Sequence, residues 1–185
     1  KRQVVNSKQT DAVLFGDHGL TAAKRKNTVI LCPTIAPEDT ESLAGRLIAA
    51  GYDVLDAPMS GGPARSRNGT MSLMLAGDDA VIQRHQAVLD AMSDKIFRLG
   101  ARIGDGARYK LVNNLVAGMN LIASAEAVAL GVKLGLDPKT LVALMSASSG
   151  QSMMMEDRLN RALANDYAPR AYAYILTKDV ALGLD

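Results

Sequence analysis

The first hundred residues alternate between short apolar runs and segments with helical spacing. The apolar and β-branched runs predict four strands, at Thr28–Leu31, which we expect to be buried, and at Tyr52–Ala57, Thr70–Ala76 and Lys95–Leu99. Apolar residues that recur at helical spacing predict three helices, at Gln9–Phe15, Glu38–Ala50 and Ala80–Met92. Strands that alternate with helices of this length are typical of crossover units, whose strands run parallel. We therefore predict a mostly parallel sheet covered by helices over residues 1–103.

Beyond Gly106 the chain shows only helical patterns. The predicted helices are Ala107–Leu134, a helix from the cap Asp137-Pro138 to Ser146, Met153–Ala164 and Ala171–Leu184, with Pro169 between the last two. Gly100, Gly104 and Gly106 interrupt both kinds of periodicity. The pattern therefore predicts an α/β region followed by an all-helical domain over residues 104–185.

One stretch, Leu111–Leu134, is apolar enough to raise the question of a membrane. It carries two asparagines near its start, and Glu126 and Lys133 further along. A carboxylate in the middle of a bilayer is costly. Apolar residues that cover nearly the whole circumference also describe a helix that is buried between other helices. We expect such a buried helix, and no membrane.

Composition narrows the classes of partner. Lys and Arg number 21 against 19 Asp and Glu, a net charge of +2, so no strong field directs the surface toward nucleic acid. The one cysteine, Cys32, forbids an internal disulfide and fits a reducing, cytoplasmic location. With only His18 and His85 beside it, a metal cluster is not expected.

The first candidate for chemistry follows the second predicted strand. The run from Asp56 to Pro63 reads Asp-Ala-Pro-Met-Ser-Gly-Gly-Pro. Ligands of open α/β sheets bind at the carboxyl ends of strands. There the backbone amides of Gly61 and Gly62 could approach an anion closely, and the Ser60 hydroxyl could donate to it. An ordinary turn explains the same composition.

The second candidate is Lys110, near the start of the long predicted helix. Asn113 and Asn114 follow at helical spacing, so the three residues share one face, which apolar side chains flank. Burial lowers the pKa of a lysine toward neutrality, as a general acid or base requires. The alternative is a lysine whose ammonium stays in water. Further along, Lys178-Asp179 is by itself typical of a surface ion pair.

Three separated motifs together resemble the β-hydroxyacid dehydrogenases. They are Asp56–Gly62 with Gly69-Thr70-Met71, Gly104–Gly106 leading to Lys110 and Asn113-Asn114, and Lys178-Asp179. Their order and the change from α/β to all-α make the resemblance specific, and it runs from Val4 to Asp179. Gly150–Ser152 and Asn165–Arg170 look most like the L-threonate dehydrogenase branch of the family.

The resemblance implies a fold, an activity and a set of site residues. The fold would be the C-terminal part of a Rossmann-like domain followed by an all-α domain, with the site in the cleft between them. The activity would be hydride transfer between NAD or NADP and a small β-hydroxy acid of the 3-hydroxyisobutyrate, tartronate semialdehyde (glycerate) or threonate class. Lys110 would be the general acid or base, with Asn114 beside it. The binding residues would be Ser60, Gly61, Gly62 and Asn113 for the substrate, and Thr34, Lys178 and Asp179 for the cofactor.

One expected feature of the family is missing from the sequence. No G-x-G-x-x-G cofactor fingerprint occurs, and Gly16-Asp17-His18-Gly19 follows a helix-like segment, which is the wrong context. We therefore expect the sequence to be an interior piece of a longer enzyme, and the choice between NAD and NADP stays open. An isolated piece of this kind is expected to bind no cofactor detectably.

Other interpretations stand beside the enzyme. A non-catalytic scaffold or interaction module could keep the fold without the chemistry, although the presence of Lys110 and Asn114 argues against it. A phosphorylated sugar acid could be the substrate, although only Arg65 and Arg67 stand near Ser60 in the sequence. The long apolar helix offers more surface than one chain would cover, so we expect a homodimer or homotetramer.

Overall fold

A five-stranded sheet forms the centre of the first compact unit. The computed structural model describes residues 4–23, 27–168 and 173–184. The strands are β1 (Thr28–Leu31), β2 (Asp53–Asp56), β3 (Met59–Ser60), β4 (Ser72–Gly77) and β5 (Lys95–Arg98). β1 pairs with β2 and β4 with β5 in parallel, each over four residue pairs, whereas β4 pairs with β2 and with β3 in antiparallel, each over two. The sheet is therefore mostly parallel, as predicted.

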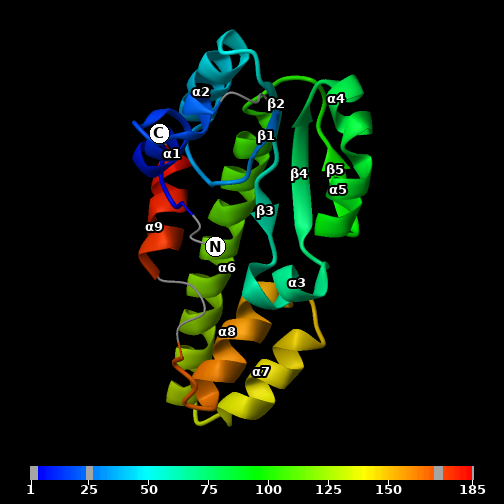
Figure 1. Ribbon diagram of the computed structural model, residues 1–185. Helices are drawn as coiled ribbons and strands as arrows, with labels where there is room; N and C mark the ends of the chain where they lie inside the picture. The colour runs from blue at the N-terminus through cyan, green and yellow to red at the C-terminus, as the bar shows by residue number, and fades with distance from the viewer. Residues whose placement is uncertain (1–3, 24–26, 169–172, 185) are drawn as a thin grey trace. The chain divides into compact units, whose positions relative to one another are not determined.

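Two apolar clusters cover the two faces of this sheet. One joins α1 (Ser7–Phe15) and α2 (Pro37–Ala49) to β1 and β2. The other joins α4 (Asp79–Arg84) and α5 (Gln86–Met92) to β2 and β4. Val54 and Leu55, neighbours on β2, belong to opposite clusters because successive side chains of a strand point to opposite faces. Figure 1 shows α1 and α2 on one side of the strands and α4 and α5 on the other.

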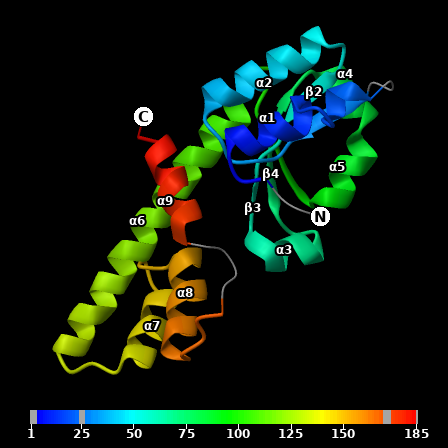
Figure 2. The ribbon, with the colours of Figure 1, turned by 60° about the vertical axis from the view of Figure 1, so that its left-hand side comes forward.

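The last helix of the chain belongs with the sheet. The first unit comprises residues 1–112 and 173–185, and the second comprises 113–172. Helix α6 (Asp105–Lys133) begins in the first unit, and α9 (Ala173–Leu182) lies beside it in both views (Figures 1 and 2). A Cβ placed on Gly183, just after α9, would be 3.6 Å from the Leu111 Cβ. The chain therefore returns from the second unit to the first.

The second unit is all-helical. It contains the rest of α6 together with α7 (Pro138–Ser146) and α8 (Met153–Leu163). Asp137 caps α7 by accepting a hydrogen bond from the Thr140 backbone N at 2.7 Å, as the sequence predicts. Val142 and Met155 are fully buried where α7 and α8 pack side by side (Figure 2).

The predicted fold class is confirmed, but two local predictions are wrong. The single helix predicted at Ala80–Met92 is two helices, because the chain turns at His85, whose Nε2 lies 2.7 Å from Thr28 Oγ1. The segment after Ser60, whose composition an ordinary turn would explain, continues into a helix, α3 (Gly62–Asn68), and Gly69 ends it with a left-handed φ of 68°. A helix of seven residues is too short to show a period in the sequence. Leu20–Ala22 forms a further short helix of the 3₁₀ type.

The predicted domain boundary, between residues 103 and 104, stays a prediction. The first compact unit instead extends to Val112, and it also includes the last helix. The predicted helix start at Ala171, and Pro169 and Arg170 of the proposed branch motif, lie outside the described residues.

Helix α6 is long and apolar enough to cross a membrane by these two criteria alone. Its most apolar window has a mean hydropathy of 1.7, and only 11% of that window is buried by the described part of the chain. Exposed apolar side chains recur along it, at Tyr109, Val112, Val116, Met119, Ile122 and Leu130. The burial expected for this helix is therefore not supplied by the residues that the structure describes.

Candidate active site

Lys110 lies in the second turn of α6 and is buried. Its side chain is 7% exposed, so the interpretation as a solvated surface lysine is wrong. Burial lowers the pKa of Lys110 from 10.5 to about 8, while the negative charge of Asp179 acts in the opposite direction. Near neutral pH this amine therefore exists in both protonation states.

Helix α9 supplies the negative charge that acts on Lys110. Asp179 is buried, and its Oδ1 accepts a hydrogen bond from Lys178 Nζ at 2.6 Å. Lys178 Nζ also donates to the backbone O of Thr34 at 2.7 Å, and Thr34 belongs to the loop after β1. The interpretation of Lys178-Asp179 as a surface ion pair is therefore wrong. The structure brings together Thr34, Lys178 and Asp179, the three residues that the resemblance assigns to the cofactor.

Asp56 ends β2 as a buried carboxylate. Its Oδ2 accepts hydrogen bonds from the backbone N of Gly104 at 2.9 Å and of Ala107 at 3.2 Å. Burial raises the pKa of Asp56 to about 6, while the amides of Ala107, Gly104 and Gly106 act in the opposite direction. Burial, and secondarily the charge of Asp56, raises the pKa of the Cys32 thiol to about 11. The Asp56 carboxylate thus joins the sheet to the helix that carries Lys110.

The other predicted residues lie on two further segments. Ser60 ends β3, and Gly61 and Gly62 follow with φ angles of 131° and 66°, which favour glycine. Within the described residues, no hydrogen bond joins these three to Lys110. Asn113 and Asn114 belong to the second unit, where Asn113 Nδ2 donates to Asn114 Oδ1 at 3.2 Å.

No role of its own is predicted for Asp56 from the sequence. A signal was present, because this residue places a carboxylate directly after the apolar pair Val54-Leu55, in a segment predicted to be a strand. A buried charge requires partners. Those partners, Gly104 and Ala107, lie 48 and 51 residues further along, beyond the reach of any local pattern.

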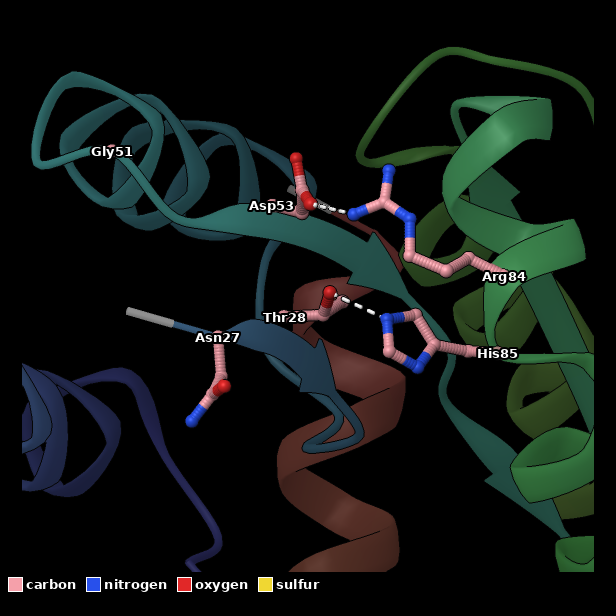
Figure 3. A pocket seen from close by; sticks show the side chains of 6 residues that line it. All are labelled: Asn27, Thr28, Gly51, Asp53, Arg84 and His85. Carbon is pink, nitrogen blue, oxygen red and sulfur yellow. Dashed lines mark hydrogen bonds and ion pairs between the residues drawn. The ribbon is translucent and has the colours of Figure 1, made fainter. Parts of the chain in front are cut away.

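A hollow of about 380 Å³ lies at the amino ends of β1 and β2. It is lined by Asn27, Thr28, Gly51, Asp53, Arg84 and His85. Figure 3 shows Arg84 bound to Asp53, at 2.6 Å, and His85 turned toward Thr28, so these four polar side chains are paired within the fold. Thr28 and Asp53 begin their strands, whereas Thr34 and Ser60–Gly62 of the predicted site lie at or after strand ends. This hollow is therefore separate from the predicted site.

Two family models match consecutive parts of the chain. The NAD binding domain of 6-phosphogluconate dehydrogenase matches residues 3–100, which is more than half of the chain. The NAD-binding domain of NADP-dependent 3-hydroxyisobutyrate dehydrogenase matches residues 104–185. The two matches meet at the glycines between β5 and α6.

Individual relatives agree with these models. The L-threonate dehydrogenase of Cupriavidus necator is 40% identical over 98% of this chain, which spans 62% of that relative's length. The crystal structure of a 3-hydroxyisobutyrate dehydrogenase from Salmonella typhimurium superposes with a TM-score of 0.91 and 33% identity, over 98% of this chain and 64% of that one. Psf3, in complex with NADP+ and 2-OPP, superposes with a TM-score of 0.89 and 26% identity, over 96% of this chain and 63% of its own. The motifs, the fold and these similarities agree, and the chain belongs to the β-hydroxyacid dehydrogenase family.

Proposed function

We propose that the protein is an NAD(P)-dependent oxidoreductase that transfers a hydride between nicotinamide and the hydroxyl-bearing carbon of a small β-hydroxy acid. The observation that carries this proposal is the buried amine of Lys110, whose pKa of about 8 suits proton transfer near neutral pH. The similarity to the L-threonate dehydrogenase of Cupriavidus necator favours substrates of the threonate class.

The described residues around Lys178 suit contact with such a cofactor. Thr34 follows the carboxyl end of a parallel strand, where open α/β sheets bind their ligands. Lys178 places a cation beside it, held in position by Asp179, which suits a cofactor that carries negative charge. Thr34, Lys178 and Asp179 would contact the cofactor. When bound, the nicotinamide accepts the hydride from the alcohol carbon or returns it to the carbonyl.

Lys110 would move the proton that accompanies the hydride. With a pKa of about 8, roughly one amine in ten is neutral at pH 7, against fewer than about one in a thousand for an ordinary lysine. The neutral amine takes the proton of the substrate hydroxyl during oxidation, and the ammonium returns it during reduction. Asp179 stabilises the ammonium that forms, because its charge favours the protonated lysine.

The substrate would be held by two further groups of residues. The backbone amides of Ser60, Gly61 and Gly62 would bind its carboxylate, because residues without side chains, here two glycines with positive φ angles, let backbone amides approach an anion closely. Asn114, four residues after Lys110 on α6, would bind the substrate beside the amine, and Asn113 would bind a second polar group. Among the described residues, no cluster of His, Cys, Asp and Glu could hold a metal ion.

An assay with a panel of acids tests this function. The protein expressed from its whole open reading frame is expected to reduce NAD+ or NADP+, followed at 340 nm, with L-threonate, 3-hydroxyisobutyrate or glycerate. Reduction with 6-phosphogluconate alone would instead support a phosphorylated sugar acid as substrate. No reduction with any acid, by a protein that binds the cofactor, would support the non-catalytic scaffold.

A second copy of the chain would cover the exposed apolar side of α6. Tyr109, Val112, Val116 and Met119 recur every three or four residues, so they form one stripe on the helix. Stripes of this kind mark interfaces in proteins that are not in a membrane. We therefore expect light scattering to give a homodimer or homotetramer. The proposed location of the protein is the cytoplasm. A monomer at micromolar concentration would contradict this expectation.

A further inference from the structure

We propose that Asp56 is a positioning residue for Lys110, which it holds in place through the first turn of α6. This inference rests on the proposed function, because it concerns how the proton-transferring amine is held. Asp56 itself touches neither substrate nor cofactor in this proposal. All the residues that carry the argument belong to the first compact unit.

The start of α6 needs an external hydrogen-bond acceptor. The first amides of any helix lack partners within the helix, and a side chain of the preceding residue usually accepts from them. The residue before α6 is Gly104, which has no side chain to accept. The carboxylate of Asp56 takes this place from the neighbouring strand and accepts from Gly104 N and Ala107 N. Charged acceptors bind amides more strongly than neutral ones.

The contact of α6 with β2 and β4 leaves no room for a side chain at Gly106. A Cβ on Gly106 would lie 2.6 Å from the backbone O of Met74 on β4 and 2.9 Å from Asp56 Oδ2. Gly106 also contributes an amide that favours the charged carboxylate. The first turn of α6 is therefore fixed in both rotation and translation against β2 and β4.

Lys110 lies one turn beyond this contact. It follows Ala107 by three residues, so the rotation of the first turn decides where its side chain points. Lys110 is 7% exposed, so the burial of its amine depends on that orientation. A loosened first turn should therefore hydrate the amine and return its pKa toward that of an ordinary lysine.

Other charges near these two residues must be kept constant in a test. Asp179 acts on Lys110 and is bound to Lys178, whereas Asp105 and the Cys32 thiol are near Asp56. All four side chains stay in place when Asp56 is substituted, although the loss of its charge removes one of the two effects that raise the pKa of the Cys32 thiol.

An ion pair at the same helix end provides a matched control. Arg108 on α6 donates to Glu41 Oε1 on α2 at 2.8 Å and to Asp105 Oδ1 at 3.1 Å. The Glu41 side chain is 39% exposed, whereas Asp56 is 2% exposed. Glu41→Gln thus removes a charged contact from the start of α6 without touching its backbone amides.

The experiment measures the pKa of Lys110 in the protein expressed from its whole open reading frame. Lysine side chains are acetylated with trace acetic anhydride across pH 6–11, and the Lys110 peptide is quantified by mass spectrometry. Asp56→Asn removes the charge and keeps the shape of the side chain. In this variant the pKa of Lys110 is expected to rise by about one pH unit. The neutral fraction of Lys110, and with it the turnover at pH 7, then falls about tenfold. In Glu41→Gln both values are expected to stay as in the wild type.

Two results would overturn the proposal. One is a folded Asp56→Asn protein in which the pKa of Lys110 is unchanged. The other is an equal rise in Glu41→Gln, which would show that any loosening of the helix start suffices. If Asp56→Asn does not fold, Asp56→Ser replaces it, because its hydroxyl can still accept one hydrogen bond from a backbone amide. The same rise in the pKa of Lys110 is expected, and an unchanged pKa would again overturn the proposal. The labelling experiment does not depend on turnover, so it tests the role of Asp56 separately from the proposed function. Full activity in a Lys110→Met variant would contradict the proposed function alone.

Discussion

Replacing Lys110 by methionine is expected to lower the turnover number of the whole protein by about 10²- to 10⁴-fold. Methionine fills nearly the same space as the buried lysine stem, so packing is kept while the proton carrier is lost. The substrate hydroxyl then loses its proton without a base beside it. The dissociation constant of the cofactor, measured by fluorescence titration, should change by less than about threefold, because Thr34 and Lys178 are retained.

A lysine at the other end of the same helix is the control for this substitution. Lys133 lies in the last turn of α6 and is exposed. Lys133→Met should leave turnover within about twofold of the wild type, since exposed substitutions away from the site change little. Full turnover in Lys110→Met, or an equal loss in both variants, would remove Lys110 from the proposed chemistry.

The same Lys110→Met substitution should stabilise the fold. The pKa of Lys110 is about 8 in the folded protein and about 10.5 when unfolded, so between these values the unfolded state binds more protons. Stability of the wild type therefore rises with pH across this window, and below it the buried ammonium costs about 3 kcal/mol. Urea denaturation should show Lys110→Met to be more stable at pH 7, with the advantage shrinking toward pH 10.5. Asp179 keeps its ion pair with Lys178.

Gly106→Ala is expected to lower the free energy of unfolding by about 3 kcal/mol, and the melting temperature by about 10 °C. The new methyl group would overlap the Met74 carbonyl and the Asp56 carboxylate. Neither can move away cheaply, because the first belongs to the backbone of β4 and the second is buried. Urea and thermal denaturation of the whole protein measure both quantities.

Gly45→Ala is the matched control for the glycine substitution. Gly45 lies inside α2, and a Cβ there would meet no atom within 4 Å. Alanine stabilises an exposed helix interior relative to glycine, so a gain of about 0.5–1 kcal/mol is expected. If Gly106→Ala were as stable as the wild type, the contact between β2 and α6 would be looser than the structure indicates.

Local patterns predicted most of the secondary structure. They failed where a helix was too short to show its period and where the chain turned between two helices. The seven residues of α3 show no period, and the turn at His85 coincides with a contact to Thr28 that no sequence window contains. The roles of the predicted site residues stay predictions. Lys178-Asp179 looks like a surface ion pair in the sequence, because Thr34, which binds Lys178 in the fold, lies 144 residues away along the chain.

By itself, the sequence determined the order of strands and helices, the change from α/β to all-α near Gly104, and the kinds of side chain available for chemistry. These follow from periodicity, capping and glycine placement, which act over a few residues. Only the tertiary structure decided that Asp179 is buried beside Lys110 and that Asp56 binds the start of α6. Burial and pKa depend on which distant segments meet, because water is excluded only where those segments pack together.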